Sequence, residues 1–214
     1  TEVCPSKALG FAGKEISQDE VFQKLLSDNV FYDISGGGVT LSGGEATLHL
    51  KWVGELAGRL SDAGINVLLE TCGCFDYSLA ETELLPYVRD IYCDLKIFDR
   101  ERHKKYCGVY NDIILENAAK LQEDAAEFGY SLLMRIPLIP GITDTAENLE
   151  ALAGFMAENG MKNASLLPYN PTWYGKNDKL GIPLADELKG LTAWQTPAET
   201  ERCRNIFRSR GINC

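Results

Sequence analysis

Several short apolar runs in this sequence end in glycines or charged residues that suit the binding of a small ligand. The first run leads directly into Gly43, Gly44 and Glu45. Glycine lets a backbone approach a ligand with no Cβ in the way, and its N–H group can face an anion. A carboxylate such as Glu45 accepts hydrogen bonds from an ammonium group. The combination suits the zwitterionic end of an amino acid, and a tight turn with a solvated Glu45 is the alternative interpretation.

The next two apolar runs also end in residues that can bind polar groups. Glu70 and Thr71 close the second run, where they could bind a hard cation or a ligand hydroxyl, or could cap a turn. In the third run Asp94 and Lys96 share one face of a strand, because side chains alternate. An acid and a base at the edge of a sheet are costly to bury unless they pair or bind a charged ligand, so a structural ion pair and a ligand site both stay open.

The last two runs carry one arginine and an apolar end. Arg135 stands in an otherwise apolar run and needs an anionic partner, which could be a carboxylate of the chain or of a ligand. The final run ends with Leu167, Pro168 and Tyr169, followed by Asn170. Apolar side chains there could lie against a flat ring while the amide binds a polar edge, or the segment could simply pack in the core.

These runs and the segments between them predict a parallel sheet crossed by helices. The runs span residues 39–42, 66–71, 91–96, 132–139 and 164–169. They start 25 to 41 residues apart, which leaves room for a helix in each interval and is typical of right-handed βαβ units. Capping boxes at Ser17 and Thr196 predict the first and last helices. An eight-fold barrel needs about 250 residues, so we expect an open or partial barrel with its ligand at the carboxyl ends of the strands.

The composition narrows the classes of protein to consider. The chain has 214 residues, with 21 Lys and Arg against 31 Asp and Glu, and a formal net charge of −10, so we expect no nucleic-acid partner and no binding to anionic membranes. No apolar run approaches the roughly 18 residues of a membrane span, and no signal peptide opens the sequence. The seven cysteines are irregularly spaced, which indicates reduced thiols and a cytoplasmic protein, expected to be a monomer.

The ordered set of motifs resembles the glycyl-radical enzyme activating enzymes, relatives of the pyruvate formate-lyase activating enzyme in the radical SAM superfamily. The motifs lie at residues 35–45, 70–73, 94–96, 135–141 and 166–169. The resemblance covers the chain from about Cys4 to about Leu180 and implies an α/β fold. The implied architecture is a partial (β/α)6 TIM-like barrel of the radical SAM type, lacking its first strand, over residues 16–214 with a C-terminal extension.

The resemblance also implies cofactors and partners. A reduced [4Fe-4S] cluster would cleave S-adenosylmethionine (SAM) to a 5′-deoxyadenosyl radical, which removes a hydrogen atom from a glycine of a large partner, the glycyl-radical enzyme. The electron donor would be a protein such as flavodoxin or ferredoxin.

The family's site residues can be carried over by motif. The methionyl amino group would be held by Gly43, Gly44 and Glu45. The pocket would be lined by Asp94, Leu95, Lys96 and Arg135, with Lys96 on the carboxylate, and the adenosine would contact Leu167 and Asn170. A monovalent-cation site would be formed by Glu70, Thr71 and Asp94. Asn170 stands where the pyruvate formate-lyase activating enzyme has a histidine.

The cysteines depart from the family pattern. The catalytic cluster of the family is held by Cys-x3-Cys-x2-Cys, and no such spacing occurs here. Cys4 resembles the final ligand of an additional ferredoxin-like cluster, so residues 1–15 are expected to be the remnant of that insert, and the chain by itself is expected to be inactive. Two alternatives stay open: another barrel enzyme of the lyase or methyltransferase type with Lys96 as its base, and a non-catalytic barrel that docks a partner.

Overall fold

The computed structural model of the chain describes residues 13–173, 181 and 186–214, and its centre is one parallel sheet. The strands are β1 (Gly38–Leu41), β2 (Asn66–Thr71), β3 (Asp90–Asp94), β4 (Ser131–Pro137) and β5 (Ala164–Leu167). They lie in the order β1-β2-β3-β4-β5, and each neighbouring pair is parallel. This consecutive order, with helical crossovers, is that of a βα barrel and confirms the five predicted strands and the α/β class.

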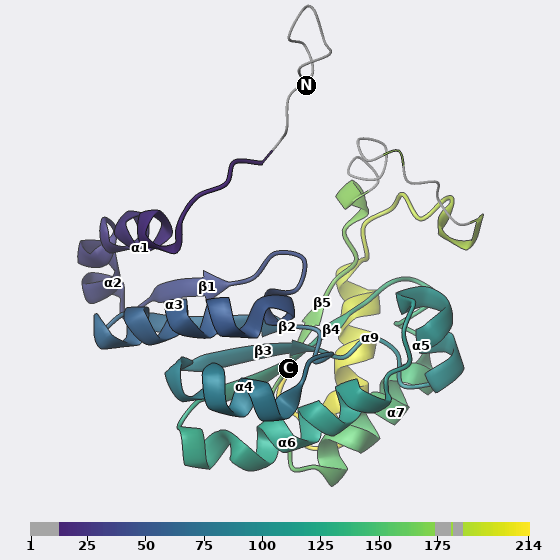
Figure 1. The fold of residues 1–214 in the computed structure, drawn as a ribbon. Helices are drawn as coiled ribbons and strands as arrows, with labels where there is room; N and C mark the ends of the chain where they lie inside the picture. The colour runs from purple at the N-terminus through teal and green to yellow at the C-terminus, as the bar shows by residue number, and fades with distance from the viewer. Residues whose placement is uncertain (1–12, 174–180, 182–185) are drawn as a thin grey trace, which may run out of the picture.

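Helices connect the strands and continue around the sheet (Figure 1). They are α1 (Gln18–Leu26), α2 (Asn29–Ser35), α3 (Leu50–Asp62), α4 (Tyr77–Glu83), α5 (Arg100–Cys107), α6 (Asp112–Phe128), α7 (Ala146–Glu158) and α9 (Pro197–Arg208), with short 3-10 turns η1 (Ala46–His49), η2 (Leu85–Tyr87), η3 (Pro171–Trp173) and η4 (Asp186–Leu188). The capping boxes predicted at Ser17 and Thr196 open α1 and α9. No helix in the described ranges is both long and apolar enough to cross a membrane.

The pleat of the strands gives the sheet two different faces. Along β2 and β3 every second side chain, such as Leu69 and Ile91, is buried in the core that the helices cover. The alternate side chains, which include Glu70, Asp94 and Arg135, are half-buried on the opposite, inner face. Since side chains alternate with a period of two, the register of the sheet decides which polar groups meet on that inner face.

The strand β1 lies at one edge of the described sheet, where only β2 pairs with it. A cavity of about 710 Å³ lies beside the end of β1 and beneath η1 and α3. The large side chains of Leu48 and Trp52 are 73% and 44% exposed there. The further strand that the resemblance implies at this edge stays a prediction.

Candidate functional site

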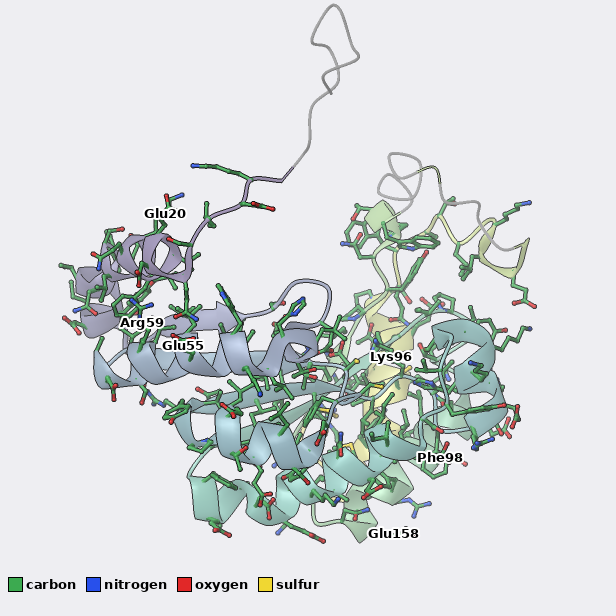
Figure 2. All side chains as sticks on the ribbon, viewed as in Figure 1. Glu20, Glu55, Arg59, Lys96, Phe98 and Glu158 are labelled. Carbon is green, nitrogen blue, oxygen red and sulfur yellow. The ribbon has the colours of Figure 1, made fainter. Side chains whose placement is uncertain are left out.

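The carboxyl ends of the first four strands meet around a small polar hollow of about 110 Å³. Its lining residues are Ser42, Gly43, Gly44, Glu45, Glu70, Thr71, Cys72, Asp94, Lys96 and Arg135. We call this set the polar hollow. It brings together eight residues predicted from the sequence, drawn from segments that are far apart in the chain. Figure 2 labels Lys96, which lies at this end of the sheet.

The register explains why these particular side chains converge. Asp94 of β3 pairs with Arg135 of β4, and Thr71 of β2 pairs with Cys93 of β3. Glu70 pairs with Tyr92, which is two residues before Asp94, so Glu70 and Asp94 lie close together on the same inner face. A methyl group built on Gly43 or Gly44 would meet no atom within 4 Å, so the glycine turn leaves open space above the strand ends.

An ion network links three of the predicted charged residues. The guanidinium of Arg135 donates from Nη1 to Glu70 Oε1 at 2.6 Å and from Nε to Asp94 Oδ1 at 2.8 Å. The Ser42 hydroxyl donates to Glu70 Oε2 at 2.8 Å. Hydrogen bonds from Ser42 and Arg135 hold the pKa of Glu70 below its usual value, although partial burial opposes them. The chain itself thus supplies the anions that Arg135 needs, and a ligand contact of Arg135 stays a prediction.

Glu45 is held by the chain rather than solvated. Its Oε1 accepts hydrogen bonds from the hydroxyls of Thr47 at 2.7 Å and Thr71 at 2.9 Å, and also from the N–H of Thr47. Its Oε2 accepts a hydrogen bond from the N–H of Cys72 at 2.7 Å, and the Cys72 thiol also hydrogen-bonds to the Glu45 carboxylate. The structure contradicts a solvated Glu45, whereas the contact of Glu45 with a ligand ammonium stays a prediction.

These bonds predict how stability depends on pH. Burial raises the pKa of Glu45, but the hydrogen bonds from Cys72, Thr47 and Thr71 outweigh it and leave the pKa below its usual value. A carboxyl group with a lowered pKa stabilises the fold above its unfolded pKa of about 4.3, and this contribution is lost as the pH falls further. Glu45→Gln should therefore reduce the free energy of unfolding by about 1–3 kcal/mol at pH 7, and the difference should shrink below pH 4.

Urea unfolding at pH 7, 5 and 3.5 checks this prediction. Glu55→Gln, on the exposed side of α3, is the matched control and should follow the wild-type protein at each pH. A wild-type-minus-Glu45→Gln difference that stays constant over this range would contradict the assignment of these bonds to an ionised Glu45.

The ammonium of Lys96 is the free cation of the polar hollow. Lys96 is half-buried, and within the described part of the chain it has no ion-pair partner. The thiol of Cys72 lies in the same hollow, where burial and the neighbouring Glu45 raise its pKa to about 11. The thiol is therefore protonated at neutral pH, and Lys96 is the group in the polar hollow that can bind an added anion.

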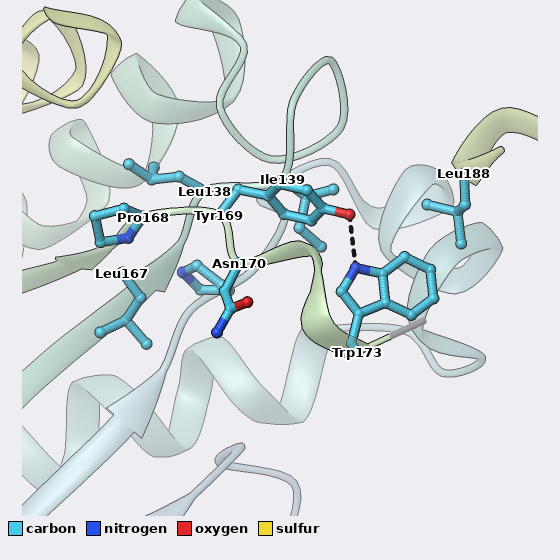
Figure 3. Close-up of a pocket in the computed structure, with 9 residues that line it drawn as sticks. Leu138, Ile139, Leu167, Pro168, Tyr169, Asn170, Trp173 and Leu188 are labelled. Atoms are coloured by element: carbon cyan, nitrogen blue, oxygen red, sulfur yellow. Dashed lines mark hydrogen bonds between the residues drawn. The ribbon is translucent and has the colours of Figure 1, made fainter. Parts of the chain in front are cut away.

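A second, apolar hollow of about 340 Å³ lies at the ends of β4 and β5 (Figure 3). Its lining residues are Pro137, Leu138, Ile139, Leu167, Pro168, Tyr169, Asn170, Trp173 and Leu188. We call this set the apolar hollow. The Trp173 indole donates from Nε1 to the Tyr169 hydroxyl at 2.6 Å, and that hydroxyl donates to the Leu191 carbonyl at 2.8 Å. Two aromatic side chains are thereby held in place beside a surface that could accept a flat ring.

The two hollows are neighbours along the same rim. β4 contributes Arg135 to the polar hollow and, two residues later on the same face, Pro137 to the apolar hollow. Pro137 pairs in turn with Leu167 of β5. Gly44 and Lys96 therefore share one hollow, while Asn170 lines the adjoining one. The Asn170 side chain accepts a hydrogen bond from Thr172 N–H at 2.9 Å.

Other predicted residues lie elsewhere. The side chain of Leu95 is 1% exposed and lies in the core, and Leu95 is not among the residues that line either hollow. Cys4 and most of residues 1–15 lie outside the described residues. His103, which the sequence analysis did not assign to the site, is 3% exposed and packs within α5, where its Nδ1 hydrogen-bonds with the Val109 carbonyl at 2.7 Å.

Three buried asparagines were missed by the sequence analysis, although each one interrupts or precedes an apolar helical pattern. Asn111, Asn117 and Asn148 are 1–4% exposed, and their amides bind backbone groups of the loops that follow β2 and β3. Such side chains replace the hydrogen bonds that the backbone loses where a strand ends.

Within the described ranges, no group of three or more His, Cys, Asp or Glu side chains is arranged to hold a metal ion. These residues therefore do not fit a [4Fe-4S] cluster. Arg135 already balances the charges of the Glu70 and Asp94 carboxylates. The monovalent-cation role of Glu70, Thr71 and Asp94 stays a prediction.

The chain is similar in sequence to several activating enzymes. No family model matches it. It is 34% identical over 213 residues to the indoleacetate decarboxylase activating enzyme of Tractidigestivibacter scatoligenes, covering 99% of this chain and 64% of that protein. It is 32% identical over 213 residues to the (2S)-3-sulfopropanediol dehydratase activating enzyme of Klebsiella oxytoca, covering 98% and 66%. The chain thus spans slightly less than two thirds of the length of these relatives.

A solved structure shares the fold. A domain of the pyruvate-formate lyase-activating enzyme from Bacteroides vulgatus superposes with a TM-score of 0.65 at 26% identity, covering 83% of this chain and 97% of that domain. The agreement between the sequence relatives, the fold and the convergent motifs confirms the predicted resemblance. Over nearly its whole length, the chain is similar to the activating enzymes of glycyl-radical enzymes.

Proposed function

We propose that this chain forms the SAM-binding barrel of an enzyme that installs a glycyl radical on a partner enzyme. The observation that carries the proposal is the adjoining pair of hollows at one rim of the sheet. The polar hollow suits the amino-acid end of SAM, and the apolar hollow suits its adenine ring. A single ligand with these two ends would span the junction between Arg135 and Pro137 on β4.

The charges of the polar hollow complement SAM. Three carboxylates, those of Glu45, Glu70 and Asp94, stand against the two cations of Lys96 and Arg135, which leaves a formal charge of −1. SAM carries an ammonium, a sulfonium and a carboxylate, which sum to +1. Oε2 of Glu45 would accept from the ammonium, and Lys96 would donate to the carboxylate.

The rest of the ligand would lie along the apolar hollow. Leu167 and Pro168 would contact the adenine face, and the Asn170 amide would donate a hydrogen bond to the adenosine. The open glycine turn at Gly43 and Gly44 leaves room for the ligand backbone to approach.

In the complete enzyme, SAM and a reduced [4Fe-4S] cluster would supply a 5′-deoxyadenosyl radical, with electrons from a protein such as flavodoxin or ferredoxin. The residues described here would bind and orient SAM and exclude water from it. The hydrogen atom would come from a glycine Cα of a glycyl-radical enzyme, the partner class that the similarity to these activating enzymes suggests.

Calorimetric titration of the protein with SAM and with S-adenosylhomocysteine tests the proposal. S-adenosylhomocysteine lacks the sulfonium charge, so the hollow should prefer SAM by about 5-fold to 10-fold at low salt, and added salt should reduce this preference. Methionine alone should bind more weakly than either ligand, because it leaves the apolar hollow empty. A protein that binds none of the three ligands, or that prefers S-adenosylhomocysteine, would contradict the proposed function.

A further inference from the structure

One buried side chain on α7 hydrogen-bonds to the backbone of Lys96 and Phe98. Asn148 is 4% exposed, and its Nδ2 donates to the Lys96 carbonyl at 3.0 Å and to the Thr143 carbonyl at 2.9 Å. Its Oδ1 accepts from the Phe98 N–H at 2.8 Å. Asn148 therefore joins the loop after β3 to the loop after β4.

These bonds matter because the regular sheet has ended at this point. β3 ends at Asp94, and the last backbone bond to β4 is donated by the Leu95 N–H to the Arg135 carbonyl at 2.9 Å. Beyond it, the Lys96 carbonyl and the Phe98 N–H have Asn148 as their partner. The Lys96 side chain makes no ion pair of its own with a described residue, so the direction in which it leaves the backbone determines where its ammonium lies.

We propose that Asn148 is a positioning residue that aims Lys96 at the carboxylate of the ligand in the polar hollow. The inference rests on the proposed function, because it assumes that the ligand carries an amino-acid carboxylate. Asn148 does not line either hollow, and it acts only through the backbone of residues 96–98. Loss of its bonds would let Lys96 sample directions away from the hollow.

Decarboxylated SAM is the probe that isolates this role, since it keeps the ammonium, the sulfonium and the adenosine and lacks only the carboxylate. Lys96→Ala should weaken SAM binding by about 10-fold to 100-fold. Asn148→Ala should weaken it by about 3-fold to 10-fold, and both variants should bind decarboxylated SAM within about twofold of the wild-type protein. In the Lys96→Ala background, Asn148→Ala should add no further loss of SAM affinity.

Asn117 provides the matched control. It is 1% exposed and donates two bonds of 2.8 Å, to the carbonyls of Gly73 and Phe75 in the loop after β2. Asn117→Ala removes the same number of amide donors away from Lys96, so its effects should be the same for SAM and for decarboxylated SAM. Asn148→Asp is a second variant with little change in size, which keeps the acceptor for Phe98 and loses the donor to Lys96.

The outcomes separate the inference from the function on which it rests. If the wild-type protein binds neither ligand, the proposed function fails and the role of Asn148 fails with it. If the wild-type protein binds SAM but the Asn148 variants weaken both ligands equally, or add their effect to that of Lys96→Ala, only the positioning role is wrong.

Discussion

Replacing Arg135 with methionine should reduce the free energy of unfolding by about 3 kcal/mol at pH 7. The side chain of Arg135 is 18% exposed and bridges Glu70 and Asp94, whose side chains are 28% and 22% exposed. Removal of the guanidinium leaves two half-buried carboxylates without their counter-ion, which is the situation in which loss of one partner is most destabilising. Lysine at this position would restore the charge but not the two-sided bridge.

The stability of the same variant should depend less on pH than that of the wild-type protein. In the wild-type protein the lowered pKa of Glu70 gives a stabilising contribution that is present above its unfolded pKa and is lost as the pH falls. Without Arg135, its hydrogen bond and its charge no longer help to lower the pKa of Glu70, so the variant loses less stability when Glu70 is protonated. The difference in urea midpoint between the two proteins should therefore narrow from pH 7 to pH 4.

Arg100→Met is the control for this prediction. Arg100 also pairs with two acids, Asp112 and Glu101, but its side chain is 50% exposed. Exposed pairs of this kind contribute about 0–1 kcal/mol, so this variant should differ little from the wild-type protein at either pH. Equal losses for Arg100→Met and Arg135→Met would mean that burial of the network has no energetic consequence.

The sequence was sufficient for the strands because each one carries a strong local signal. The runs at 66–71 and 164–169 match β2 and β5 closely, since buried parallel strands are continuous in apolar residues. One helix that the sequence analysis did not predict is α2, which precedes the first strand. In α2 the residues Val30, Phe31 and Ile34 have low helix propensity and are 65%, 69% and 81% exposed, so neither composition nor burial pattern marks it as a helix.

The sequence predicted which residues lie at the candidate site, but it did not predict which of them form ion pairs and hydrogen bonds with one another. Strand-end position alone gathers Glu45, Asp94 and Lys96 at one rim, because parallel strands have their carboxyl ends on the same side. Which acid meets Arg135 depends on register, and spacing along the chain does not give the register. Asn148 escaped for a related reason: its partners are backbone groups of residues 96–98, and backbone partners leave no mark in a sequence.

The second large effect is expected at Gly54, where α3 touches the end of α4. A methyl group built on Gly54 would lie 2.1 Å from the Glu83 carbonyl oxygen and 2.8 Å from its carbon, and these are backbone atoms that cannot rotate away. Gly54→Ala should therefore force the two helices apart and reduce the free energy of unfolding by about 2–3 kcal/mol.

Alanine at Gly58, one turn further along α3, should change the free energy of unfolding in the opposite direction. The comparison therefore identifies the close contact at Gly54 as the cause of the loss of stability there. A methyl group there would meet only the Tyr87 ring, at 3.5 Å or more, which is ordinary contact. Gly58→Ala should stabilise the protein by about 0.5–1 kcal/mol, the usual gain of alanine over glycine inside a helix. Since α3 follows the turn that Glu45 caps, the displacement in Gly54→Ala should also weaken the proposed binding of SAM, whereas Gly58→Ala should leave that binding unchanged. Thermal unfolding and SAM titration of the two variants check both effects. If Gly58→Ala also destabilised the protein, the loss of stability in Gly54→Ala could not be assigned to the contact with Glu83.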